Sequence, residues 1–117
     1  YEIVSRDWSS DVCSSDLTLA SLYDLIPSYP LEKRFQRKIG EWNQGRIRVY
    51  PNQLVQHWLN GFKVVEYERK SMIYQALVAR SKYLKYEGFG NADKGFILLQ
   101  DHGDRVSFKN IKIRALN

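Results

Sequence analysis

The sequence is poor in the residues that build cross-links and metal centres. It has one cysteine, Cys13, and two histidines, His57 and His102. A single cysteine excludes an internal disulfide and a cysteine-rich zinc site, and no group of histidines and carboxylates has the spacing of a metal site. We therefore expect neither a metal nor a cofactor.

Long apolar runs are also missing. No stretch is long enough to cross a bilayer as a helix, no secretory signal opens the chain, and the first residue is not methionine. With 117 residues the chain amounts to one domain at most. We interpret it as a piece of a longer protein.

Aromatic and basic residues, in contrast, are plentiful. Aromatics make up 14% of the chain; they favour strands and offer flat surfaces on which sugar rings can stack. The net charge of +5 would suit a nucleic-acid partner. The basic residues are scattered, however, and the one mixed cluster, Glu32–Lys38, is typical of a solvated surface, so nucleic-acid binding is disfavoured.

The first 17 residues differ from the rest. Ser9–Asp11 recurs as Ser14–Asp16, and the stretch has neither a helical nor a strand period. The end of a common sequencing adapter, read in one frame, encodes Ser-Ser-Asp-Leu. We therefore interpret residues 1–17 as a non-native leader and 18–117 as the functional part. Genuine genomic DNA upstream of Thr18 would refute this interpretation.

The clearest structural pattern is a three-stranded meander. Strands are predicted at Arg46–Tyr50, Gln53–Leu59 and Phe62–Tyr67, where apolar residues alternate with polar ones or the composition suits a strand. Pro51-Asn52 and Asn60-Gly61 are the turns between them. Asn-Gly is a strong hairpin signal, since both residues accept positive φ, and Asn60 is expected to serve the turn and not a substrate.

A helix and two further strands are predicted after the meander. Spacings of three and four predict a helix from Met72 to about Lys82, with Ser71 as its N-cap, followed by a loop. The apolar run Gly95–Gln100 predicts a strand buried on both faces. A final strand at Val106–Ile113 changes its apolar phase, which predicts a bulge near Asn110.

The predicted strands and helix do not complete a β-sandwich. One face of the sheet would lack a covering layer and two edges would be open. The physical interpretation is an incomplete all-β domain of about five or six strands with one helical insertion, its first half lying outside the chain.

Several segments together resemble the C-terminal half of the 3-keto-disaccharide hydrolase domain. The resemblance covers about residues 18–117. Its motifs are Ser21–Asp24, Gly40–Asn43, Arg46-Ile47, Gln56–Gly61, Val64–Tyr67, Ala76–Lys82, Gly95–Gly103, and Val106, Phe108 and Lys109–Arg114.

The resemblance implies a concanavalin-like jelly-roll β-sandwich. It also implies an exported bacterial protein, periplasmic or secreted in its full-length form. The implied activity is cleavage of glycosides whose C3 hydroxyl has been oxidised to a ketone, so the expected partner is an oxidised disaccharide or glycoside. Because part of the family's domain is missing, the fragment alone is expected to be inactive.

Cleavage next to a 3-keto group needs a base, an acid and donors for an enolate oxygen. Histidine is the side chain best suited to proton transfer near neutrality. His57, in mid-strand, is either a satisfied interior histidine or a pocket residue. Asp101 and His102 either make a turn or lie in a site at a strand end, where Gln100 would share one side with His102. We take His57, Asp101 and His102 as the catalytic candidates and Gln100 as a substrate-binding candidate.

Two aromatic residues are candidates for stacking on sugar, Tyr23 and Trp58, although a residue of either kind is more often part of the core. The candidate carboxylates are Asp24, Glu66 and Asp101. A non-catalytic carbohydrate-binding module on the same fold, with Tyr23 and Trp58 as platforms, is the alternative function; a purely structural module is a third possibility.

Overall fold

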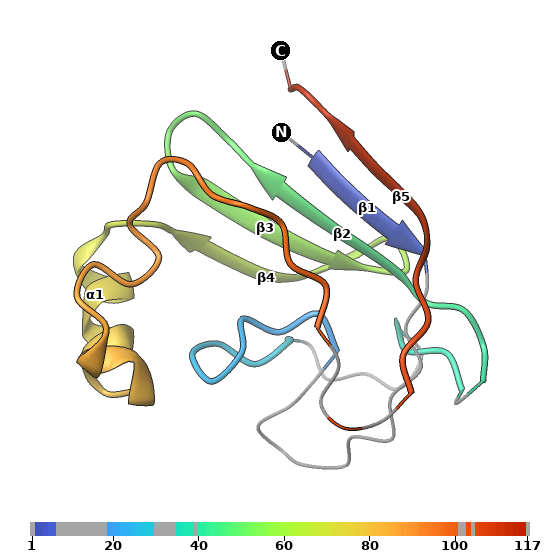
Figure 1. The fold of residues 1–117 in the computed structure, drawn as a ribbon, viewed down its shortest axis with the longest axis horizontal. Helices are drawn as coiled ribbons and strands as arrows, with labels where there is room; N and C mark the ends of the chain where they lie inside the picture. The colour runs from blue at the N-terminus through green and yellow to red at the C-terminus, as the bar shows by residue number, and fades with distance from the viewer. Residues whose placement is uncertain are drawn as a thin grey trace.

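The computed structural model shows a sheet with one helical unit at its side (Figure 1). Its described residues are 2–6, 19–29, 35–38, 40–100, 103 and 105–116. For residues 2–6 the backbone alone is described. No helix in these ranges is long and apolar enough to cross a bilayer.

Within these ranges the sheet has five antiparallel strands in the order β4-β3-β2-β1-β5. They are β1 (Glu2–Arg6), β2 (Gln44–Val49), β3 (Leu54–Leu59), β4 (Phe62–Glu68) and β5 (Lys109–Arg114). The predicted meander is confirmed as β2, β3 and β4. The first and last strands of the chain lie side by side, with β1 between β2 and β5 (Figure 1). The sequence had predicted no strand at β1.

The β3–β4 turn is closed by Asn60, as the sequence predicted. Asn60 and Gly61 have φ values of 48° and 89°, the conformation that this two-residue hairpin turn requires. The Asn60 side chain accepts a hydrogen bond from the Gln44 backbone N–H at 2.8 Å and donates to Asn43 Oδ1 at 2.9 Å. Asn60 therefore fixes the start of β2 as well as the turn.

The predicted bulge near Asn110 is also confirmed. Asn110 has a φ of 54°, and the β1–β5 register shifts between Val4, which pairs with Lys112, and Arg6, which pairs with Lys109. The extra residue bends β5 where it meets β1.

The helix begins as predicted and ends earlier. In α1 (Met72–Ala79) the Ser71 hydroxyl accepts the Tyr74 N–H at 3.1 Å. A short 3-10 helix, η2 (Lys82–Lys85), follows in place of the last predicted turn. Tyr74 stacks on Tyr67 of β4, with 5.7 Å between ring centroids, which ties α1 to the sheet.

The prediction of a buried strand at Gly95–Gln100 is wrong for this chain. The segment has no regular secondary structure, and Phe96 and Leu98 are 105% and 80% exposed. A strand buried on both faces needs a pairing partner and covering layers. The described residues supply no pairing partner and no such cover for this segment.

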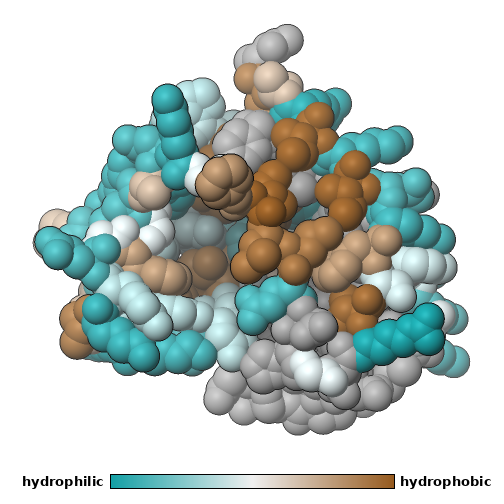
Figure 2. All heavy atoms as spheres, viewed as in Figure 1, coloured by the Kyte–Doolittle hydropathy of each residue, from teal (hydrophilic) through white to brown (hydrophobic). Residues whose placement is uncertain are grey.

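The core covers one half of one sheet face. Phe35, Leu59, Val64 and Val65 form the buried cluster, with Leu19, Ala20, Leu22, Ile26 and Tyr67 packed against it. Beyond it lies an exposed group that we call the apolar patch, which extends over β2, β5 and the segment 95–100 (Figure 2). The apolar patch consists of Ile47, Phe96, Ile97, Leu98, Leu99, Ile111 and Ile113.

Candidate functional site

Strand alternation sends the two central site candidates to opposite faces of the sheet. Along β3, Val55, His57 and Leu59 are buried, whereas Gln56 and Trp58 are only half-buried. Successive side chains of a strand point to opposite faces. His57 therefore lies on the face with the core, and Trp58 lies on the other face.

The Trp58 face carries a line of polar residues across all five strands. Residues paired across an antiparallel sheet share a face. The register pairs Glu66 with Gln56, Gln56 with Arg48, Arg48 with Glu2, and Glu2 with Arg114. We call these five positions the polar row, in which Glu2 is placed by its backbone alone. The equivalent line on the other face is Val65, His57, Ile47, Ile3 and Ile113.

Gln56 organises the polar row around its amide. Its Nε2 donates to Glu66 Oε2 at 2.7 Å, and its Oε1 accepts the Trp58 indole N–H at 3.3 Å and the Tyr50 hydroxyl at 3.4 Å. The Arg48 guanidinium lies 5.2 Å from the Trp58 ring centroid. The result is an aromatic surface edged by donors and acceptors, a combination that suits sugar hydroxyls and sugar C–H faces.

Glu66 is held ionised at the edge of the polar row. Lys63 Nζ lies 2.8 Å from Glu66 Oε2. This hydrogen bond, and the one from Gln56, lower the pKa of Glu66. Because Glu66 is exposed and stays charged at neutral pH, it can accept hydrogen bonds but is a poor proton donor.

His57 is fixed in one tautomer by the chain that covers it. It is 6% exposed, and its Nδ1 lies 2.8 Å from the carbonyl oxygen of Ala20. A carbonyl can only accept, so Nδ1 carries the proton and Nε2 is the basic nitrogen. Burial lowers the pKa of His57, although hydrogen bonds to the backbone of Ala20 and Ser21 oppose the shift. His57 is therefore neutral at pH 7.

This burial makes a pH-dependent contribution to stability. A lowered pKa in the folded state means that the unfolded chain binds more protons once the pH falls below 6.5, the ordinary value. We expect the free energy of unfolding of the full-length protein, measured by urea denaturation, to decrease toward acid below that pH. The decrease should be smaller in His57→Gln. An equal decrease in both proteins would contradict this account.

Tyr23 belongs to a cation–aromatic contact at the edge of the core. The Lys82 ammonium lies 4.3 Å from the Tyr23 ring centroid, and a hydrogen bond with Tyr23 raises the pKa of Lys82. Tyr23 is 41% exposed and so is not a core residue. One of its ring faces is already covered by Lys82. Its role as a sugar platform stays a prediction.

The other predicted site residues are Gln100, Asp101 and His102. Gln100 is exposed, and Asp101 and His102 lie outside the described residues. Their roles, like that of His57, stay predictions. Among the described residues, no three His, Cys, Asp or Glu side chains come together as a metal-binding group.

The spacing of polar residues along the strands is a signal for part of the polar row, although no site residue was predicted from it. Gln56 and Trp58 are two residues apart, as are Arg46 and Arg48, so each pair must share a face of its strand. What local sequence could not supply is the register that aligns Arg48 with Gln56 and brings Glu2 next to it.

Comparison with known proteins settles the family. Residues 1–114 match the family described as the 3-keto-alpha-glucoside-1,2-lyase-like domain. The chain belongs to this family. A curated relative, the 3-keto-disaccharide hydrolase of Bacteroides thetaiotaomicron, is 37% identical over 130 residues, an alignment that covers all of this chain and 43% of the relative. The chain thus spans less than half of that relative's length.

A solved structure shows the fold. It is a protein assigned as a glycosyl hydrolase from Parabacteroides distasonis, with a TM-score of 0.68 and 19% identity over 94% of this chain and 67% of that one. At this identity the likeness concerns the fold alone. The chain therefore forms part of a concanavalin-like β-sandwich, as predicted.

Proposed function

We propose that the full-length protein cleaves the glycosidic bond of 3-keto-glycosides by elimination followed by hydration. The observation that carries the proposal is the family match over residues 1–114. A base removes the C2 proton, which the C3 ketone acidifies. A C1=C2 double bond forms as the C1–O bond breaks, and the leaving oxygen takes a proton from an acid. Water then adds its hydroxyl to C1 and a proton to C2.

This sequence of steps reconciles the two names found among the relatives. The first half-reaction is a lyase step and the second is a hydration, so their sum is hydrolysis. The family description names the lyase step, and the Bacteroides relative is named for the overall outcome.

The chain contributes two kinds of groups to this chemistry. We propose that Arg48 of the polar row donates to sugar hydroxyls, because a guanidinium is always charged and has several N–H donors. Trp58 and Gln56 would hold one sugar ring on the polar-row face, and Tyr23 and Gln100, whose segments lie on the His57 face, would hold another. Proton transfer is assigned to Asp101 and His102, which follow the segment 95–100 in the sequence.

His57 is the third residue proposed for proton transfer. With the proton on Nδ1, its Nε2 is the unprotonated nitrogen that a general base needs. His57 lies, however, on the face opposite Arg48 and Trp58. One sugar ring cannot contact both faces, so the reacting ring would lie on the face of His57 and the segment 95–100, and the polar row would bind another part of the substrate. A loss of turnover in His57→Gln without a loss of stability would favour a direct role.

The test of the proposed function uses two matched substrates. The full-length protein is expected to cleave a 3-keto disaccharide and to leave the same disaccharide, unoxidised, intact. Cleavage of both at similar rates would contradict the elimination mechanism. Binding of both without cleavage of either would favour the non-catalytic carbohydrate-binding module.

Trp58 is expected to matter for binding. Trp58→Ala in the full-length protein should weaken binding of the unoxidised disaccharide, measured by calorimetry, by about tenfold, or ~1.4 kcal/mol. The matched control is Trp42→Ala, since Trp42 is 46% exposed and lies beside Lys109, outside the polar row. Equal losses in the two variants would contradict a specific role for Trp58.

We also propose that the full-length protein is periplasmic or secreted. A signal peptide encoded at the start of the complete gene would support this location, and its absence would contradict it.

A further inference from the structure

A cavity that we call the basic cavity lies at the end of the sheet where β2 and β5 begin (Figure 1). It has a volume of about 470 Å³, within the range of about 300–1,000 Å³ that is usual for small-molecule sites. It therefore has room for a small molecule as well as for a single ion. Its lining consists of Arg37, Trp42, Asn43, Gln44, Asn60, Lys109 and Asn110.

The sheet register brings Lys109 to this cavity. The backbone of Arg6 in β1 pairs with Gln44 on one side and with Lys109 on the other. Gln44 and Lys109 therefore lie on one line across the strands, although they are far apart in the sequence. The Lys109 ammonium lies 3.6 Å from the Trp42 ring centroid, a contact that holds its positive charge at the wall of the cavity.

The lining is positively charged and contains no carboxylate. Arg37 and Lys109 are both exposed, and a guanidinium and an ammonium are charged at neutral pH. None of the ion pairs between described residues involves either of them. Glu41, close by in the sequence, does not line the cavity, and its Oε2 accepts the Lys38 backbone N–H at 3.2 Å. No residue of the lining balances the two positive charges.

The β3–β4 turn already uses two amide oxygens of the lining. Asn43 is 3% exposed, and its Oδ1 accepts hydrogen bonds from the Arg37 backbone N–H and from Asn60 Nδ2, each at 2.9 Å. Asn60 Oδ1 accepts the Gln44 backbone N–H at 2.8 Å. Because these oxygens are engaged within the protein, the charged donors of Arg37 and Lys109 dominate what the cavity offers to a ligand.

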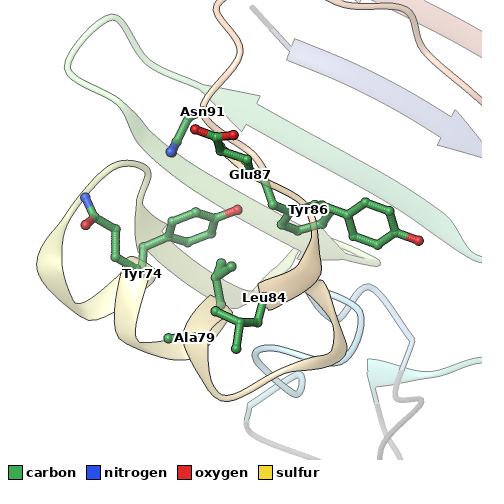
Figure 3. Close-up of a pocket in the computed structure, with 10 residues that line it drawn as sticks. Tyr74, Ala79, Leu84, Tyr86, Glu87 and Asn91 are labelled. Atoms are coloured by element: carbon green, nitrogen blue, oxygen red, sulfur yellow. The ribbon is translucent and has the colours of Figure 1, made fainter.

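The smaller cavity between α1, η2 and the loop after them has a different character (Figure 3). It has a volume of about 180 Å³. Its lining is mostly apolar and aromatic, and Glu87 is the one charged residue in it. Such a lining favours no particular class of ligand. The basic cavity, in contrast, selects for negative charge.

We propose that the basic cavity binds an oxyanion, that is, a carboxylate, sulfate or phosphate group. Arg37 can hold two oxygens of such a group through paired N–H donors, and Lys109 adds a point charge. The volume accommodates either a free inorganic anion or a small molecule that carries the group. Gln44 precedes Arg48 by four residues on β2, about 13 Å along a strand. The site is therefore separate from the polar row, and it does not rest on the proposed function.

Removing the positive charges one at a time tests this site in the full-length protein. Lys109→Gln and Arg37→Gln each replace a charged side chain of the lining by a neutral polar one. The matched controls are Lys112→Gln and Lys38→Gln, which remove the same charge from exposed residues that do not line the cavity. The bond to Asn43 uses the backbone of Arg37, so all four variants should melt at the temperature of the unsubstituted protein.

The probes are glucuronate and inorganic sulfate, with glucose as the neutral comparison. Binding is measured by calorimetry at a constant ionic strength that is set with sodium chloride, because screening weakens exposed charges. We expect glucuronate and sulfate to compete for one site. Lys109→Gln and Arg37→Gln should each weaken this binding by about fivefold or more, and the two controls should leave it within about twofold. Any binding of glucose should be the same in all variants.

The order of the two affinities identifies the source of the anion. Tighter binding of glucuronate would assign the cavity to an acidic sugar, and tighter binding of sulfate would assign it to a free inorganic anion. Failure of both probes to bind, equal losses in the cavity variants and the controls, or glucose binding that falls together with glucuronate binding would each overturn the proposal.

Turnover separates this result from the proposed function. Lys109→Gln is expected to cleave a neutral 3-keto disaccharide at the unsubstituted rate. A protein that binds the anion in the basic cavity but cleaves no 3-keto sugar would contradict the proposed function and leave the anion site standing. Active protein without anion binding would do the reverse.

Discussion

Replacing His102 by alanine in the full-length protein is expected to lower turnover of a 3-keto disaccharide by roughly 10²–10⁴-fold, the usual contribution of a general acid or base. Histidine is the side chain whose ordinary pKa lies near neutrality, so its loss removes a proton carrier that no simple neighbour replaces. Binding of the unoxidised disaccharide should change little, because the sugar is held by the polar row.

The control for His102→Ala is Lys94→Ala, which changes an exposed residue eight positions earlier in the sequence with no assigned role. Turnover in this control should equal that of the unsubstituted protein. If His102→Ala kept more than half of the original turnover, proton transfer would have to be assigned elsewhere, with His57 and Asp101 as the remaining candidates.

The chain expressed alone is expected to aggregate or to lack a sharp cooperative melt. Its apolar patch includes Leu98, 80% exposed, and Ile113, 57% exposed. Contiguous exposed apolar surface of this kind marks an interface. We propose that segments of the same domain outside this chain cover the patch, as the second layer of the sandwich.

Replacing Ile113 by aspartate should have opposite effects in the chain alone and in the full-length protein. Ile113→Asp is expected to improve the solubility of the chain alone and to reduce its binding of a hydrophobic dye. In the full-length protein the same change would bury a charge and lower the free energy of unfolding by about 3 kcal/mol or more. Met72→Asp, on an 87% exposed residue of α1, is the control and should change little in either context. A soluble, dye-free monomer with a sharp melt would contradict the proposal.

Local signals were enough to predict the meander, the start of the helix and the bulge in the last strand. Asn60-Gly61 forces one turn geometry, Ser71 caps one helix, and Asn110 takes the positive φ of a bulge. Each of these features depends on residues close in sequence. The strand predicted at Gly95–Gln100 failed because its burial depends on partners that the described residues do not include.

Long-range pairing explains the rest of what the sequence did not reveal. β1 lies between β2 and β5, about forty and over a hundred residues away along the chain. Because residues 1–17 were interpreted as a non-native leader, no strand was predicted there. Glu2–Arg6 pairs with both neighbours, and the family match begins at residue 1. The foreign origin of the leader stays a prediction, which the genomic DNA can test.

In the candidate site, too, local sequence gave part of the answer and long-range pairing was needed for the rest. His57 and Trp58 were chosen from residue type, and strand alternation alone would have separated them. The polar row depends on the sheet register, which joins Glu66 at one end to Arg114 at the other. No local pattern in the sequence contains that alignment.

The elimination mechanism predicts a label that simple hydrolysis would not leave. Cleavage of a 3-keto disaccharide by the full-length protein in D₂O, followed by NMR at early times, should give a released 3-keto sugar with deuterium at C2, because hydration adds a solvent proton there. His102→Ala and an enzyme-free sample correct for spontaneous exchange. Released sugar that keeps its original hydrogen at C2 would contradict the mechanism on which the functional assignment depends.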